Sequence, residues 1–310
     1  MTITEYFKSD RQEYWLDQIE QSDWGAGKYL HQLLKTGSLK KLCGKGTRVL
    51  LLTDRDALVS FCTLAEKDDI PDTALTPWVG FVYTFPAFRG HRHAGQLLDY
   101  AAHTAKEDGA GHIHISTNAS GLYEKFGYSF FALLKDLGGD DSRVYRIPLK
   151  RESADRQMSA ENMWADYVRA NDLKDDTYQA WAFGAAPDLL KDLTLAGIKS
   201  AAASAFDLYE ISGESLPKAG DHSVILDAQG SAVCVIRTLK AYVVPFNEVS
   251  AEHARKEGEG LRDLATWRKV HETFFTDCLA SEGLTFREDM KVVCEEFEVV
   301  YRPRDEKGTA

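Results

Sequence analysis

A loop of closely spaced arginines, histidines and glycines in the first half of the chain has the residue types that bind an anion. The loop consists of Arg89, Gly90, His91, Arg92, His93, Ala94 and Gly95. It follows a strand-like segment, residues 78–85, and precedes a stretch whose apolar residues recur at helical spacing. Where a strand ends and a helix begins, unpaired backbone N–H groups and the helix dipole favour negative charge. The sequence therefore predicts a phosphate-binding loop here.

This loop and a second segment downstream resemble the GNAT superfamily of acetyl-CoA-dependent acyltransferases. The family's loop reads Arg/Gln-x-x-Gly-x-Gly/Ala, and Arg89, Arg92 and Ala94 stand at its three defining positions. Arg92 replaces the usual glycine and adds a cation beside the expected phosphate. Residues 116–128, which read STNASGLYEKFGY, look like the family's Asn-x-x-x-x-Tyr-x-x-x-Gly-Phe/Tyr segment. The resemblance covers roughly residues 10–148, about one domain.

The resemblance implies an α/β fold with a mixed, splayed central sheet and acetyl-CoA in the gap. The residues that it places on the cofactor are Val82, Tyr83 and Thr84 of the strand, Arg89, Gly90, His91, Arg92, His93, Ala94 and Gly95 of the loop, and Asn118. Tyr123 is the candidate general acid, because acyl transfer from a thioester expels a thiolate that a positioned phenol can protonate. The base that deprotonates the amine acceptor is left open among Glu66, Asp68, Asp69 and several histidines.

Several separated segments of the second half resemble the ASCH domain, a small β-barrel related to the RNA-binding PUA modules. These segments are residues 181–184 (WAFG), 197–204 (GIKSAAAS), 216–221 (LPKAGD) and 257–260 (EGEG), followed by Trp267, Arg268 and His271. The match extends over roughly residues 160–303, again about one domain. The resemblance implies an α+β, PUA/ASCH-like β-barrel with flanking helices.

Some ASCH relatives cleave the amide of an acetylated cytidine with a Lys-x-x-Thr arrangement and a distant Glu, and others have been proposed as ribonucleases. Lys199 and Glu257 match two of these roles, but Ala202 stands where the threonine is expected and has no hydroxyl. Ser200 or Ser204 could replace it, although a displacement of about 1 Å can cost around a hundredfold in rate. We expect this domain to bind a nucleoside or short RNA more than to hydrolyse one.

A structural role is the alternative for the same residues. Lys199 would then form an ion pair with Glu257 or Glu259, and the aromatic residues of the motifs would belong to the core. Those aromatic residues are Trp181, Phe183 and Trp267.

Apolar periodicity indicates the elements that position these motifs. In the first half it predicts two helices within residues 11–36, a helix at 94–107, and strands at 48–53, 57–64, 78–85, 112–116 and 130–134. In the second half it predicts helices at 163–170, 176–196 and 264–281, and strands at 223–226, 232–238, 242–246 and 292–301.

Polarity and charge change after residue 150, so we predict a first domain at 1–150, a second at 157–304 and a disordered tail at 305–310. The first 150 residues hold 18 Lys and Arg against 19 Asp and Glu, whereas the remainder holds 19 against 29. Neither half clusters its cations as broad nucleic-acid binding requires.

Cysteine and histidine usage predicts no metal. The five cysteines are widely spaced and are expected to be reduced core residues. His91 with His93, and His112 with His114, could share a face, but without carboxylates or cysteines at ligand spacing we expect solvated histidines. No long apolar run and no leader-like N-terminus are present, so we expect a cytoplasmic protein without membrane contact.

The sequence thus predicts an N-acetyltransferase that moves an acetyl group from acetyl-CoA to a small-molecule or peptide amine, fused to an ASCH-like domain that binds a nucleoside or short RNA. One alternative is a non-catalytic CoA- and nucleotide-binding regulator. The other is an amidohydrolase or ribonuclease activity in the second half.

Overall fold

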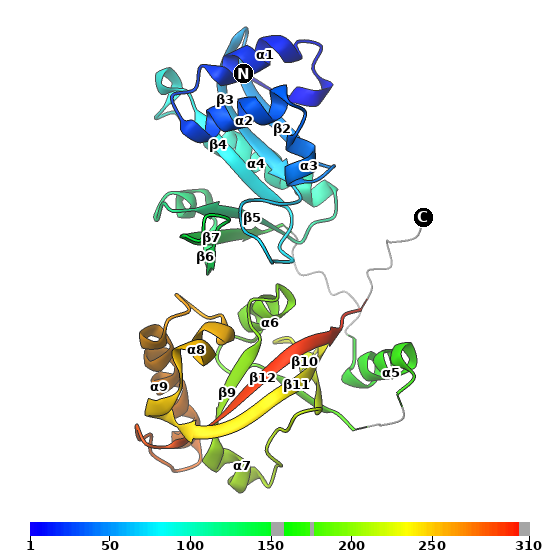
Figure 1. The fold of residues 1–310 in the computed structure, drawn as a ribbon, viewed down its shortest axis with the longest axis vertical. Helices are drawn as coiled ribbons and strands as arrows, with labels where there is room; N and C mark the ends of the chain where they lie inside the picture. Colours follow the sequence, from blue (N-terminus) through cyan, green and yellow to red (C-terminus); the bar gives the residue numbers. More distant parts are fainter. Residues whose placement is uncertain (150–157, 174–176, 304–310) are drawn as a thin grey trace. The chain divides into compact units, whose positions relative to one another are not determined.

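The computed structural model describes residues 1–149, 158–173 and 177–303. The chain divides into two compact units, Met1–Ser153 and Ala154–Ala310, each built around a sheet of its own (Figure 1). The predicted boundary at residues 150–157 and the predicted tail at 305–310 lie outside the described residues.

In the described part of the first unit, seven strands form one sheet in the order β1-β2-β3-β4-β5-β7-β6. The strands are β1 (Thr2–Glu5), β2 (Arg48–Asp54), β3 (Ala57–Ala65), β4 (Trp78–Thr84), β5 (His112–Thr117), β6 (Ser129–Lys135) and β7 (Asp141–Pro148). β4 and β5 run parallel, and the remaining neighbours are antiparallel. The predicted mixed sheet is confirmed.

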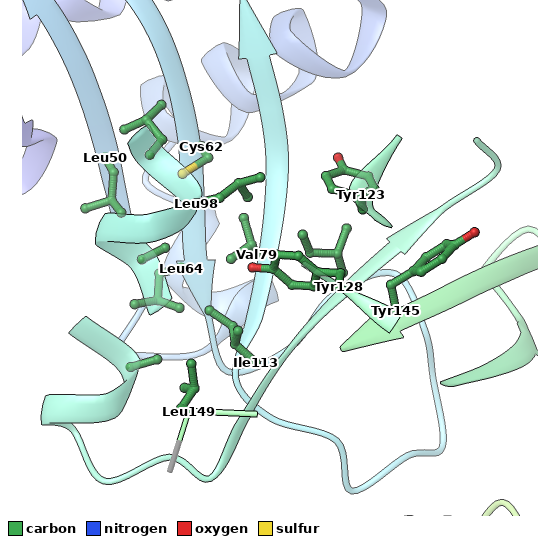
Figure 2. Packing of buried hydrophobic residues seen from close by; sticks show 14 of the residues in the cluster. Leu50, Cys62, Leu64, Val79, Leu98, Ile113, Tyr123, Tyr128, Tyr145 and Leu149 are labelled. Atoms are coloured by element: carbon green, nitrogen blue, oxygen red, sulfur yellow. The ribbon is translucent and has the colours of Figure 1, made fainter. Parts of the chain in front are cut away.

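Helices cover both faces of this sheet. They are η1 (Tyr6–Lys8), α1 (Gln12–Glu20), α2 (Gly25–Lys35), α3 (Leu39–Cys43), η2 (Pro86–Phe88), α4 (His93–Glu107) and η3 (Tyr123–Phe126). Leu50 of β2 packs with Leu97 of α4, whereas its neighbour Leu51 packs with Ile19 of α1. Successive strand residues point to opposite faces, so the sheet lies between α4 on one side and α1 with α2 on the other. Figure 2 shows the core on the α4 side.

The sheet forks between β4 and β5. Within the described residues, their single ladder pair joins Trp78 to His114, whereas β5 pairs with β7 along its whole length. Past Trp78, β4 carries a bulge: its pairing with β3 shifts register next to Phe81, whose φ is 52°. A bulge bends the strand that contains it. The sheet is therefore splayed, as predicted from the GNAT resemblance.

Among the described residues of the second unit, five strands form a sheet in the order β8-β10-β11-β12-β9, curled into an open half-barrel. Its strands are β8 (Gln179–Ala182), β9 (Ala201–Ala205), β10 (His222–Leu226), β11 (Ala232–Pro245) and β12 (Lys291–Tyr301). Its helices are α5 (Ala160–Asn171), α6 (Pro187–Leu195), α7 (Phe206–Ser212), η4 (Phe246–Glu248), α8 (Ala251–Glu257) and α9 (Leu264–Ser281). The predicted ASCH-like fold with flanking helices is confirmed.

The single helix predicted over residues 176–196 is wrong. Gln179–Ala182 form β8, which pairs in parallel with β10, and the helix starts only at Pro187. Proline at the first helical position cannot extend a helix backwards, because it has no N–H and its ring blocks the preceding turn.

The cysteines and histidines depart in part from their predicted settings. All five cysteines are free, and four are buried, but Cys278 is partly exposed. His93 and His114 are buried rather than solvated, because the first starts α4 and the second lies on the central strand β5. In the described parts of the chain, no group of three or more His, Cys, Asp and Glu side chains has an arrangement that could hold a metal ion, and the helices found there are too short or too polar to cross a membrane.

The connection from β4 into α4 carries backbone strain at one residue. Arg92 precedes the helix with φ 58° and ψ 26°, the left-handed region that disfavours residues with a Cβ atom. We predict that Arg92→Gly raises the free energy of unfolding by about 1 kcal/mol, because glycine adopts this conformation without the clash. Urea unfolding monitored by tryptophan fluorescence measures the change. Arg92→Ala is the control: it removes the charge but keeps Cβ, and an equal gain there would contradict the explanation.

Candidate functional site

The predicted anion loop lies directly before α4, at the end of β4 where the sheet has forked. Gly90 is left-handed with φ 86°, as is Arg92, so the chain turns tightly into the helix. In the described structure no side chain caps the first turn of α4. The buried His93 ring at its first position has an Nδ1 atom without a hydrogen-bond partner. Helix amides without a cap, beside an exposed arginine, form an electropositive site.

Arg89 faces away from this helix end. Its Nε donates to the Thr84 carbonyl at 3.0 Å, and its Nη2 lies 3.2 Å from the Asp23 carboxylate. The Tyr83 hydroxyl also donates to Asp23, and Ser60 donates to the Tyr83 carbonyl at 2.6 Å. Arg89 therefore fixes the end of β4 against the segment between α1 and α2, and Arg92 is the loop arginine without such contacts in the described structure.

The two predicted motifs contact each other. Phe126, from the second motif, lies so close to Gly95 that a Cβ atom there would come within 3.0 Å of its ring. The Arg92 guanidinium lies 6.0 Å from the centre of the same ring. Asn118 is exposed just after β5, and Val82 packs against the core on the α4 side. The anion loop and the end of η3 are thus in contact.

Tyr123 begins η3 and packs in the core next to Tyr128, with ring centres 6.1 Å apart. Figure 2 shows the phenol oxygen of Tyr123 pointing away from the cluster and that of Tyr128 pointing into it. Burial, and to a lesser degree Cys62 and Asp68, raises the pKa of Tyr123 to about 12. The phenol therefore stays protonated over the physiological pH range, as a hydrogen-bond donor must.

Asp68 lies at the fork itself. Gly80 and Ser116 each follow the last paired residues of β4 and β5 by two positions. A Cβ atom on Gly80 would lie 3.3 Å from Asp68 Oδ1, and Ser116 Oγ is 2.8 Å from Asp68 Oδ2. The carboxylate thus lies beside both residues that a continuous ladder would pair. Of the base candidates left open by the sequence, Asp68 is at the fork and Asp69 lies next to it.

A second carboxylate, that of Asp69, competes with Asp68 for the hydroxyl proton of Ser116. Ser116 Oγ is also 2.8 Å from Asp69 Oδ1, yet one hydroxyl proton can satisfy only one of the two acceptors. Burial, followed by the charge of Asp69, raises the pKa of Asp68 to about 6. Asp68 is therefore ionised at pH 7 but more basic than an ordinary carboxylate.

Glu66 is held elsewhere, because it accepts from the Gly46 amide at 2.7 Å. That contact is at the rim of a cavity of about 400 Å³ near the other end of α4. Glu66 is therefore not placed to act at the fork.

The second unit contains a pocket of about 530 Å³, a size typical of small-molecule sites. Lys199, Glu257 and Ala202 all line it, so the three positions singled out by the ASCH resemblance meet at one cavity. Lys199 Nζ lies 3.0 Å from Glu257 Oε2 and 2.8 Å from Glu259 Oε1. The predicted ion pair and the predicted pocket therefore coexist.

Glu257 is buried and surrounded by donors. Its Oε1 accepts from Trp267 Nε1 at 2.7 Å and lies 3.3 Å from His253 Nε2 and 3.5 Å from His271 Nε2. Burial opposes its ionisation, but Lys199 and the histidines outweigh it, so the pKa of Glu257 is well below its usual range. Burial likewise opposes the charge on Lys199, yet the two carboxylates keep its pKa raised. Lys199 is thus a cation and cannot serve as a base.

The pocket also holds residues that the sequence did not single out. Thr238 of β11 donates its hydroxyl to Glu295 of β12, and Glu295 is the ladder partner of Ala202. Burial raises the pKa of Glu295, assisted by the charge of Asp221. Ser204 lines the pocket and shares a hydrogen bond of 2.9 Å with Tyr209. Three glutamates, Glu295, Glu296 and Glu298, interrupt the apolar pattern of residues 292–301, so the sequence alone does not single out Glu295.

Family models match both units. The acetyltransferase (GNAT) domain matches residues 45–130, and the ASCH domain matches residues 179–301. The chain therefore carries a GNAT acetyltransferase domain followed by an ASCH domain. None of the curated proteins matched the chain.

Solved structures resemble each unit separately. An ASCH domain from Lactobacillus crispatus JV V101 is 29% identical, covers 47% of this chain and 98% of its own, and has a TM-score of 0.44. A protein from Enterococcus faecalis V583 is 36% identical over 44% of this chain and 85% of its own, with a TM-score of 0.42. The aminoglycoside 6'-N-acetyltransferase from Enterococcus faecium is 12% identical over 49% of this chain and 99% of its own, with a TM-score of 0.39.

Gly258 makes the ion-pair site possible, because it separates the two glutamates that converge on Lys199. Its φ is 76°, and a Cβ atom there would lie 2.7 Å from the Ile198 carbonyl oxygen. We predict that Gly258→Ala lowers the free energy of unfolding by roughly 1–3 kcal/mol, measured by chemical denaturation. Gly213→Ala is the matched control, since Gly213 also ends a helix with φ 70° but faces open space. Equal losses of unfolding free energy in both variants would show that the close approach of Gly258 to the Ile198 carbonyl does not contribute to the effect.

Proposed function

We propose that the first domain transfers the acetyl group of acetyl-CoA to an amine. The observation that carries the proposal is the fork between β4 and β5. The uncapped start of α4 follows the end of β4, where the strands are separated, and the carboxylate of Asp68, whose pKa is raised, lies beside the two strands near their last ladder pair. The GNAT match supports acyl chemistry of this class.

The residues present fit acetyl-CoA in its general features. Uncapped amides at the start of α4 and the exposed Arg92 suit a pyrophosphate, because both supply positive potential that a phosphate can approach. Beyond Trp78, the edge of β4 that faces β5 forms no ladder pairs within the described residues, and it extends between the start of α4 and the fork. The extended, amide-containing arm of acetyl-CoA can pair with a strand edge of this kind. Val82 and Thr84 lie on this part of β4, and Asn118 follows the facing strand β5.

Acetyl-CoA, when bound, supplies an acetyl group activated as a thioester. Asp68 accepts the proton that the ammonium form of the acceptor must lose before its nitrogen can attack the carbonyl carbon. The nitrogen loses a second proton as the C–N bond forms and the C–S bond breaks, and the sulfur finally carries that proton.

Tyr123 donates a hydrogen bond to the departing sulfur as negative charge develops on it. Its pKa of about 12 lies above the ~8.5 of an ordinary thiol, so stabilisation by this hydrogen bond, rather than complete ionisation of the phenol, is its contribution.

For the second domain we propose binding of one small ligand of about nucleoside size, without hydrolysis. The pocket of about 530 Å³ is lined by Trp181, Phe183 and Phe274, which offer stacking surfaces. Ala202 supplies no nucleophile, and Lys199 is fixed as a cation between Glu257 and Glu259. The Lys-x-x-Thr mechanism therefore lacks its threonine and its neutral base here. Ser204, the alternative hydroxyl that lines the pocket, is hydrogen-bonded to Tyr209.

Tyr123→Phe tests the role of the phenol. We expect turnover to fall by about 100-fold while the dissociation constant of acetyl-CoA stays unchanged, because only the hydrogen bond to sulfur is removed. Turnover is measured by thiol release with a panel of primary amines, and affinity by isothermal titration. Tyr128→Phe is the control, because its hydroxyl is buried without a partner and points into the core. Equal turnover of Tyr123→Phe and the wild type would remove the phenol from the mechanism.

Asp68→Asn tests the base through the pH profile. In the wild type kcat/KM should decline as the pH falls through about 6, because protonated Asp68 cannot accept a proton. The variant should be slower at pH 7 and should lack this acidic limb. Glu66→Gln, on a side chain bound to Gly46, should retain the wild-type profile. An acidic limb that persists unchanged in Asp68→Asn would assign the base to another group.

A further inference from the structure

The pocket of the ASCH domain is strongly unbalanced in charge. Five acidic residues line it: Glu214, Asp221, Glu257, Glu259 and Glu295. Among the described residues that line the pocket, Lys199 is the single lysine or arginine. A pocket with this lining has a negative potential, because low-dielectric walls concentrate the field of the uncompensated carboxylates.

The one cation is not available to a ligand. Lys199 Nζ is shared between the carboxylates of Glu257 and Glu259 and also lies 3.4 Å from the Glu257 carbonyl oxygen. Its side chain is almost completely buried, with a relative exposure of 2%. A phosphate that entered the pocket would therefore meet carboxylates without a cation to offset them.

In the part of the chain that the structure describes, two of the other acidic residues that line the cavity have no cation beside them, so a ligand that binds there is favoured if it carries a positive charge. Glu295 and Asp221 both line the cavity, and neither forms an ion pair within the described residues. Thr238 donates one hydrogen bond to Glu295, and the Lys218 amide donates one to Asp221 at 2.9 Å. Each carboxylate retains further acceptor capacity, and the burial that raises the pKa of Glu295 would be offset by a cation beside it.

The aromatic lining suits the same kind of ligand. Trp181 and Phe183 meet edge to face, with ring centres 5.1 Å apart, and Phe274 also lines the cavity. The Lys199 ammonium already lies 5.2 Å from the centre of the Phe183 ring. Aromatic faces attract cations and also bury apolar surface, so they accommodate both parts of an aromatic amine.

We propose that the ASCH pocket binds a small organic amine in its cationic form, with an aromatic or apolar body against Trp181 and Phe183 and the ammonium at Glu295. The inference rests on the proposal that this cavity is a ligand site. Acetylation turns an ammonium into a neutral amide, so the pocket would hold the amine and release its acetylated form. The two domains would then recognise one chemical class.

Isothermal titration of the full chain with tryptamine, its neutral analogue N-acetyltryptamine, uridine and uridine 5'-monophosphate tests this proposal. Tryptamine should bind at least about tenfold more tightly than N-acetyltryptamine, since a hydrogen bond to a charged group is worth more than one to a neutral group. Glu295→Gln should remove that preference while keeping the acceptor for Thr238. Glu298→Gln is the matched control, because Glu298 lies on the same strand, pairs with Arg237 and is outside the pocket.

Two results would overturn the inference, and they differ in meaning. Binding of uridine or its monophosphate in preference to tryptamine, unaffected by Glu295→Gln, would show that the cavity is a ligand site for another chemical class. Absence of saturable binding for all four compounds would reject the cavity as a ligand site for these classes. Neither result bears on acetyl transfer in the first domain, which is measured separately by thiol release.

Discussion

The first domain depends on a carboxylate that stands where two parallel strands separate. Asp68 contacts Ser116 on β5 and closely approaches Gly80 on β4, the residues that follow the ladder pair of Trp78 and His114 by two positions. Backbone groups freed by this fork are costly unless something pairs with them. A ligand with its own amides can do so, and the raised pKa of the Asp68 carboxyl suits the proposed role of proton acceptor. The proposed chemistry therefore centres on the residue that contacts both strands at the fork.

A comparable arrangement organises the second domain. Gly258 lets Glu257 and Glu259 approach Lys199 from one short segment, and the resulting buried cluster forms one wall of the pocket. Breaking a buried ion pair by removing one partner leaves an uncompensated charge and is strongly destabilising. The cluster is thus part of the fold, and recognition is left to residues such as Glu295 whose charge is not already paired.

The sequence predicted those features that a local pattern or a family resemblance encodes. The anion loop at 89–95 follows from residue types at a strand-to-helix junction, whereas the splayed sheet and the pairing of Lys199 with Glu257 rest on the GNAT and ASCH resemblances. Asp68 could be named only as one of several bases, because its position depends on how a loop folds back over β4. Glu295 could not be assigned, since the ladder pairing that brings it beside Ala202 and Thr238 joins distant segments. The strand at 179–182 was missed for the same reason: pairing with β10 overrode its local pattern.

The central claim is that the forked sheet and the loop before α4 form an acetyl-CoA site. Isothermal titration of acetyl-CoA into the full chain, beside an Arg92→Ala variant, tests it most directly, because in the described structure this exposed side chain makes none of the contacts by which Arg89 fixes the end of β4. The account predicts saturable binding with one acetyl-CoA per chain that is weakened in the variant and by added salt. No binding to the wild-type chain, or equal binding to both proteins, would contradict it.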